Sequence, residues 1–125
     1  MTSWRADPLP SLKTAVALDP DHGPAHTDLA MALLRAGKSK EASPVANRAV
    51  DLSPWDPAAV DSLAQAAAAI GKCKEAIALE KREVWLLDQP DQAERLRLHI
   101  AADEANCGAA KPAAPPVQAS TPAAR

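Results

Sequence analysis

The sequence predicts an all-α protein made of antiparallel helical hairpins that stack on one another. The first observation is an internal repeat: residues 23–56 align with residues 57–90 at a spacing of 34, with twelve identical pairs, among them Leu29/Leu63 and Gly37/Gly71. The second is that apolar residues recur three and four positions apart, and the third is that Gly and Pro separate the apolar stretches. Such a period indicates stacked hairpins, because one helical hairpin cannot bury its apolar face alone.

The first predicted helix covers residues 10–18, where Ala15, Val16 and Leu18 match residues 34 positions later. Residues 1–22 therefore form a partial repeat that holds a second helix only. Residues 24–36 form the next helix, because Pro24 suits a first turn and Gly37 ends the pattern.

The helix of residues 39–52 completes a repeat that spans residues 23–56. Pro44 lies near its start, where a missing N–H costs little, although a helix beginning before Lys40 would be kinked. After the turn of residues 53–57 the cycle restarts, with helices at 57–70 and 74–87 in a second repeat that spans 57–90.

Beyond Leu87 the repeat breaks, and a capping helix is predicted at residues 91–107. Asp91 with Glu94 resembles a capping box, and Ala93, Leu96 and Ile100 form a narrow apolar stripe. Such a polar-backed helix would cover the last apolar face of the stack. Residues 108–125 are rich in Pro and Ala and are predicted to be disordered.

Composition excludes several classes of protein. The 125 residues support one small domain, and a net charge of -2 does not favour a nucleic-acid partner. No apolar stretch is long enough to insert in a membrane, and the N-terminus lacks a secretory signal. The expected location is cytoplasmic, or periplasmic or extracellular if the chain is a piece of an exported protein. Since alanine is abundant, the core should depend on Leu, Ile, Val and the tryptophans, Trp4, Trp55 and Trp85.

The residues offer little for catalysis, a cofactor or a metal. The glycines lie singly at predicted helix ends, so no Gly-rich phosphate loop exists. His22 and His26 lie near Asp21, but a turn leading into a helix with a packed His26 explains them better than a metal site. His99 is expected at the surface of the last helix, and the many acids show no sign of paired burial. We therefore expect no enzyme, no cofactor and no metal site.

The spacing of small and large residues resembles the tetratricopeptide repeat family. The residues that carry the resemblance in the first full repeat are His26, Leu29, Ala30, Leu33, Ala42, Ala46, Ala49 and Pro54. In the second they are Val60, Leu63, Ala64, Ala67 and Ala76, with Gly71 at the bend. The aromatic positions of the family are lost, Ala46 and Glu80 replace its bulky residue, and Glu83 replaces its late Ala.

The resemblance implies a right-handed superhelix whose concave face, lined by the first helix of each repeat, holds a peptide or helix of another protein. The positions that would line this groove are Thr27, Met31, Leu34, Asp61, Gln65 and Ala68. None is Lys or Asn, so the clamp by which some members hold a partner's C-terminal carboxylate is not expected. The alternative is that Met31 and Leu34 belong to the core.

These observations favour a non-catalytic scaffold for a protein or peptide partner, which would form the C-terminal part of a longer repeat array. The alternative is a regulatory or targeting appendage of an enzyme or larger assembly encoded upstream. The apolar face of residues 10–18, which lacks its hairpin partner, predicts self-association or a loosened N-terminus.

The only two cysteines, Cys73 and Cys107, lie at the start of one predicted helix and just after the end of the next. If these helices pack antiparallel, the cysteines come within bridging range, and a disulfide would join the capping helix to the stack. Two free, partly buried thiols are the alternative, because no signal sequence indicates an oxidising compartment.

Overall fold

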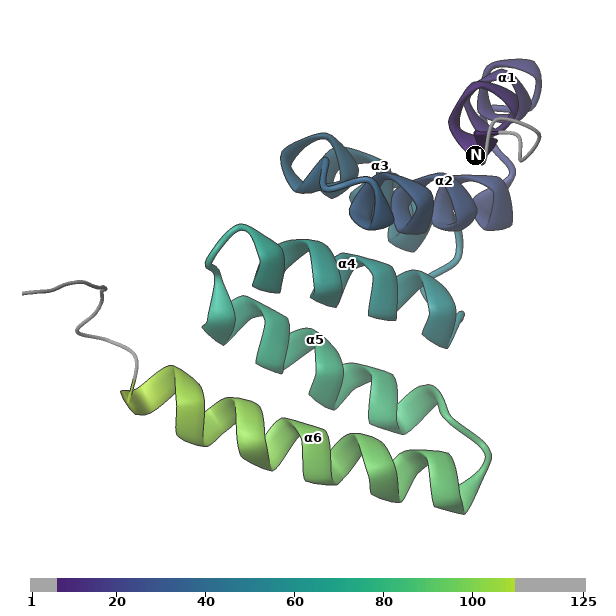
Figure 1. Cartoon of the computed structure of the whole chain (residues 1–125). Coiled ribbons are helices and arrows are strands. Elements are labelled where there is room, and N and C mark those ends of the chain that lie inside the picture. The colour runs from purple at the N-terminus through teal and green to yellow at the C-terminus, as the bar shows by residue number, and fades with distance from the viewer. Residues whose placement is uncertain (1–6, 110–125) are drawn as a thin grey trace, which may run out of the picture.

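The computed structural model describes residues 7–109, which form a row of α-helices joined by short turns (Figure 1). The helices are α1 (Pro8–Leu18), α2 (Gly23–Arg35), α3 (Ser39–Leu52), α4 (Pro57–Ala69), α5 (Cys73–Leu86) and α6 (Pro90–Ala109). No strand occurs within residues 7–109. The predicted all-α fold is confirmed, and the helices up to α5 begin and end within two residues of the predicted positions.

The helices end and begin where the sequence provides the necessary residues. At the end of α2, Gly37 has a φ of 78°, and the N–H of Lys38 donates to the Leu33 carbonyl at 2.8 Å. Gly71 repeats this geometry with a φ of 88° after α4. Both are Schellman turns, in which a residue other than glycine would be strained. Asp7 and Asp56 accept hydrogen bonds from backbone N–H groups in the first turns of α1 and α4 and thereby cap them.

The stack is built from two hairpins, α2 with α3 and α4 with α5. Helix α3 packs against α4, so the first hairpin lies on the second, while α1 packs against α2 and α6 packs against α5 (Figure 1). The first helices of the hairpins, α2 and α4, also contact each other, whereas α4 and α6 do not. This arrangement agrees with the predicted solenoid of stacked hairpins.

The core is made mostly of alanine. Leu33 and Val60 are its largest fully buried apolar side chains, and fully buried alanines surround them: Ala30, Ala42, Ala46, Ala49, Ala59 and Ala66. The expectation that the tryptophans contribute to the core is wrong for Trp55 and Trp85, which are 69% and 88% exposed. Both indoles lie at or near helix ends, where no further helix within residues 7–109 covers them. Trp4 lies outside the described residues.

Two expectations about helix ends are also wrong. Helix α6 begins at Pro90, so Asp91 lies inside its first turn and pairs with Arg95 at 3.7 Å rather than forming a capping box. The helix continues through Gly108 to Ala109, so this glycine does not end it, and the predicted tail lies outside the described residues from 110 onwards.

Pro44 lies in the interior of α3, which begins at Ser39.

None of the helices within residues 7–109 combines the length and the apolar character that crossing a membrane requires.

Candidate functional site

The predicted groove positions occupy one face of α2 and one face of α4, because each set is spaced by four and three residues. On α2, Thr27 is buried and its hydroxyl donates to the Gly23 carbonyl at 3.4 Å, while Met31 and Leu34 are half-buried. Leu34 packs against the core, as the alternative interpretation of this residue expects. On α4, Asp61 is half-buried and accepts a hydrogen bond from Gln65 at 2.7 Å, and Gln65 and Ala68 are exposed.

Helix α6, which the sequence predicts only as a capping helix, carries residues at positions equivalent to the groove positions of α4. The positions 34 residues after Asp61, Gln65 and Ala68 are Arg95, His99 and Ala102, and all three are exposed. We refer to the predicted positions on α2 and α4, together with these three residues of α6, as the groove face. Helices α4 and α6 do not contact each other, and helix α5 packs against both. We call α5, which lies between them, the floor of the groove face.

Two glutamates lie in this floor. Glu80 and Glu83 of α5 are 7% and 9% exposed, and the Oε1 atom of each is buried without a hydrogen-bond partner. The expectation that the acids show no paired burial is therefore wrong. Burial of a carboxylate is costly unless it is paired or protonated, so these two side chains require an explanation.

Helix α6 supplies the neighbours of Glu80. The Nε2 atom of His99 lies 3.2 Å from Oε2 of Glu80 and 3.1 Å from Oδ2 of Asp103. His99 is more than half exposed, as expected for a surface residue, but its ring spans two carboxylates. Asp61 on α4 lies near enough to Glu83 to contribute to raising the pKa of that carboxyl. The side chains of Asp61, Glu80, Glu83, His99 and Asp103 are named the acidic cluster below.

The acidic cluster alters proton binding. Burial, together with a hydrogen bond and repulsion from Asp103, raises the pKa of Glu80 from 4.5 to about 7, against an opposing effect of His99. Burial, together with repulsion from and a hydrogen bond to Asp61, raises the pKa of Glu83 from 4.5 to about 8. Four carboxyl groups and one imidazole thus share a small space, and the folded chain retains protons there near neutral pH.

The Cys73–Cys107 disulfide lies at one end of the same region. The Cα atoms of Cys73 and Cys107 are 5.9 Å apart, within the range for a disulfide, and the bond joins the start of α5 to α6. A cavity of about 200 Å³ adjoins it and is lined by residues of α4, α5 and α6 that include Ala68, Ile77 and Asp103. The predicted pairing of the cysteines is therefore present in the structure.

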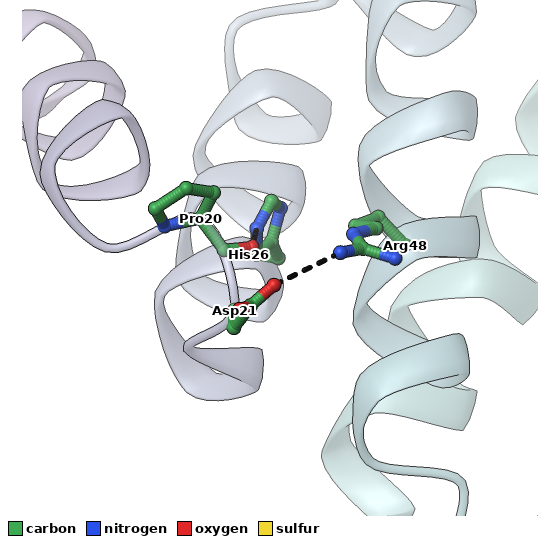
Figure 2. Close-up of polar contacts among 4 residues, drawn as sticks. All are labelled: Pro20, Asp21, His26 and Arg48. Atoms are coloured by element: carbon green, nitrogen blue, oxygen red, sulfur yellow. Dashed lines mark hydrogen bonds and ion pairs between the residues drawn. The ribbon is translucent and has the colours of Figure 1, made fainter.

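His26 and Asp21, near the start of α2, each contact another part of the chain. The Nε2 atom of His26 donates to the Pro20 carbonyl at 2.8 Å, and Asp21 pairs with Arg48 of α3 at 3.2 Å (Figure 2). Both side chains therefore tie the turn before α2 to the stack.

The sequence did contain a signal for the buried glutamates. Glu80 and Glu83 stand 34 positions after Ala46 and Ala49, which are completely buried in α3. They are also among the positions at which the chain departs from the repeat pattern. The repeat spacing alone could therefore have predicted buried acids, whereas the approach of His99 and Asp103 depends on how α6 packs.

Comparison with known proteins agrees with the fold. A family model described as tetratricopeptide repeat matches residues 9–57 and 27–94 of the chain. No curated protein matches the chain.

Proposed function

Because the chain belongs to the tetratricopeptide repeat family, whose repeats generally mediate contacts between proteins, we propose that it is a non-catalytic interaction scaffold. Its ligand is an extended peptide or a helix of another protein, bound along the groove face. The observation that carries the proposal is the alignment of accessible side chains on the first helices of successive hairpins, Met31 on α2 and Gln65 and Ala68 on α4.

The chemistry of the groove face supports a particular kind of ligand. Half-buried Met31 offers apolar area, and the exposed amide of Gln65 can donate and accept hydrogen bonds. Asp61 adds a carboxylate beside them. A peptide with alternating apolar and polar side chains would match this surface better than a C-terminal carboxylate, for which no Lys or Asn is provided on α2 or α4.

Selection from a displayed peptide library against the 125-residue chain tests the proposal, followed by affinity measurement with two matched variants. Ala68→Arg places a long cation on the groove face, while Ala78→Arg places the same side chain on an exposed position of α5. Alanine and arginine have similar helix propensities, so both variants should fold. The selected peptide should bind Ala68→Arg at least tenfold more weakly and Ala78→Arg unchanged. Equal binding by both variants, or a library that yields no peptide, would contradict the proposal.

If the chain is instead a regulatory or targeting appendage of an enzyme or larger assembly, the same surface would bind a different partner. Finding that the reading frame continues into a catalytic domain would favour that alternative.

A further inference from the structure

We propose that Glu80, His99 and Asp103 bind a divalent transition-metal ion of the zinc class between α5 and α6. The site lies partly on the groove face, because His99 belongs to that face, while Glu80 comes from the floor and Asp103 from α6. It rests on the geometry of the three side chains and on the unpartnered oxygen of a buried glutamate.

The ligand atoms already lie close together. Oε2 of Glu80 and Oδ2 of Asp103 are 3.2 and 3.1 Å from Nε2 of His99, and the potential ligand atoms of the three residues lie within 4.8 Å of one another. Zinc bonds of about 2.0–2.2 Å to nitrogen and oxygen place neighbouring ligands of a tetrahedral site about 3.3 Å apart. Small rotations of these side chains would therefore bring them around one ion.

The second observation is the buried carboxylate itself. The side chain of Glu80 is only 10% exposed, and its Oε1 atom is buried without a hydrogen-bond partner. Glu83 beside it has an Oε1 atom in the same condition. Charged groups that are buried in proteins are usually paired or bound to a metal, and the described residues supply only the His99 ring as a cationic partner for Glu80. A divalent cation would balance the excess of carboxylates in the acidic cluster.

The donor types select the class of ion. An imidazole nitrogen with two carboxylate oxygens suits zinc and its neighbours, whereas calcium requires six to eight oxygen ligands and magnesium retains most of its water. One consequence is mechanical. The ion would join α6 to α5 at a second point, one to two helical turns from the Cys73–Cys107 disulfide.

The test is calorimetric titration of Zn²⁺ into the metal-free chain with its disulfide intact, at pH 7.5. We expect one ion per chain with micromolar or tighter affinity, and at least tenfold weaker binding by His99→Gln and by Asp103→Asn. His22→Gln and Asp91→Asn are the matched controls, because both residues are exposed and lie outside the acidic cluster, and they should bind as the parent chain does. Substitution by Co²⁺ should give the visible absorption of a site with nitrogen and oxygen ligands, without a thiolate band.

Helical circular dichroism of every variant establishes that it is folded, and the exposure of His99 makes its replacement safe in this respect. The proposal is overturned by the absence of binding below millimolar Zn²⁺, by binding that survives in His99→Gln, or by an equal loss in His22→Gln. It is also overturned if a Lys- or Arg-containing peptide binds the acidic cluster while Zn²⁺ does not, because the cationic partner would then be a protein side chain. The zinc titrations are made without a peptide, so they test the metal site whether or not the groove face binds one.

Discussion

Small side chains determine how closely the helices of each hairpin approach. Ala30 on α2 and Ala64 on α4 occupy equivalent positions and are 0% and 1% exposed. A larger side chain there would push the two helices of the hairpin apart, and the thin alanine core has few flexible side chains that could absorb the change.

Replacing Ala30 or Ala64 by Trp should therefore strongly destabilise or unfold the domain. Overpacking costs roughly 1–3 kcal/mol or more, which is a large part of the stability of a small domain. Thermal melting followed by circular dichroism measures the effect, with Ala78→Trp at an exposed position as the control. Melting temperatures of Ala30→Trp and Ala64→Trp equal to that of the parent chain would show that the hairpin contacts are assigned incorrectly.

The buried glutamates predict an unusual dependence of stability on pH in the metal-free chain. The folded pKa values, about 7 for Glu80 and about 8 for Glu83, lie above the ordinary value of 4.5 that both groups have when exposed. The folded chain therefore binds more protons than the unfolded chain between these limits. Its stability should decrease as pH rises from about 5 to about 8, by up to ~1.4 kcal/mol per pH unit for each extra bound proton.

Urea unfolding at pH 5, 6, 7 and 8 in the presence of a chelator measures this decrease. Glu83→Gln should raise stability at pH 8 and make the curve flatter, because the amide never has to be buried as an anion next to Asp61. Glu75→Gln, at an exposed position of α5, should leave the curve unchanged. Stability that increases between pH 5 and pH 8 would contradict the assignment of the acidic cluster.

At the scale of the helices, the sequence predicted most of the architecture because the signals that begin and end helices are local. Pro57 fits a first turn and Gly71 adopts a positive φ, and neither depends on distant contacts. The expectations that are wrong concern residues whose surroundings depend on how the helices pack against one another. Asp91 was expected to cap the last helix although α6 begins at Pro90, and Trp85 was expected in the core although no helix within residues 7–109 covers it. The acidic cluster combines α4, α5 and α6, so no single helix reveals it.

The disulfide acts between helices, because it fixes α6 to α5. The chain-entropy model gives about 3–4 kcal/mol for a loop of roughly 35 residues, and α6 otherwise buries only a narrow apolar stripe that includes Ala93 and Ile100. We expect the reduced chain, and the Cys73→Ser/Cys107→Ser variant, to unfold at clearly lower urea concentration than the oxidised chain.

Intact-mass measurement after alkylation without reductant tests the bond directly. Protein folded in an oxidising compartment should take up no label, because no other cysteines are present. Addition of reductant should not change the stability of the double serine variant, which controls for effects of the reductant elsewhere. Uptake of two labels by the untreated protein would contradict the bond.

At the scale of the whole molecule, the two ends of the stack are not equally covered. Helix α1 contacts α2 but has no hairpin partner within the described residues, whereas α3 is packed between α2 and α4. Helices α1 and α3 can be compared directly because they occupy equivalent positions in the repeat. Leu12 and Ala15 of α1 remain half-buried, while their equivalents Ala46 and Ala49 in α3 are completely buried. The difference is the apolar surface that a hairpin partner of α1 would cover.

This uncovered surface, together with Leu18 at 81% exposure, predicts that two copies of the chain associate through α1. Sedimentation velocity over a range of concentrations should show a dimer that forms as concentration rises. Leu18→Glu should shift the equilibrium towards monomer by at least tenfold, because a charge would have to be buried in the interface. Leu98→Glu, which makes the same change on exposed α6 at the other end of the stack, is the control and should leave the dimer intact. If the parent chain stays monomeric at high micromolar concentration, or if Leu98→Glu disrupts the dimer as strongly as Leu18→Glu, then α1 is not the interface and its half-buried residues are simply exposed to solvent.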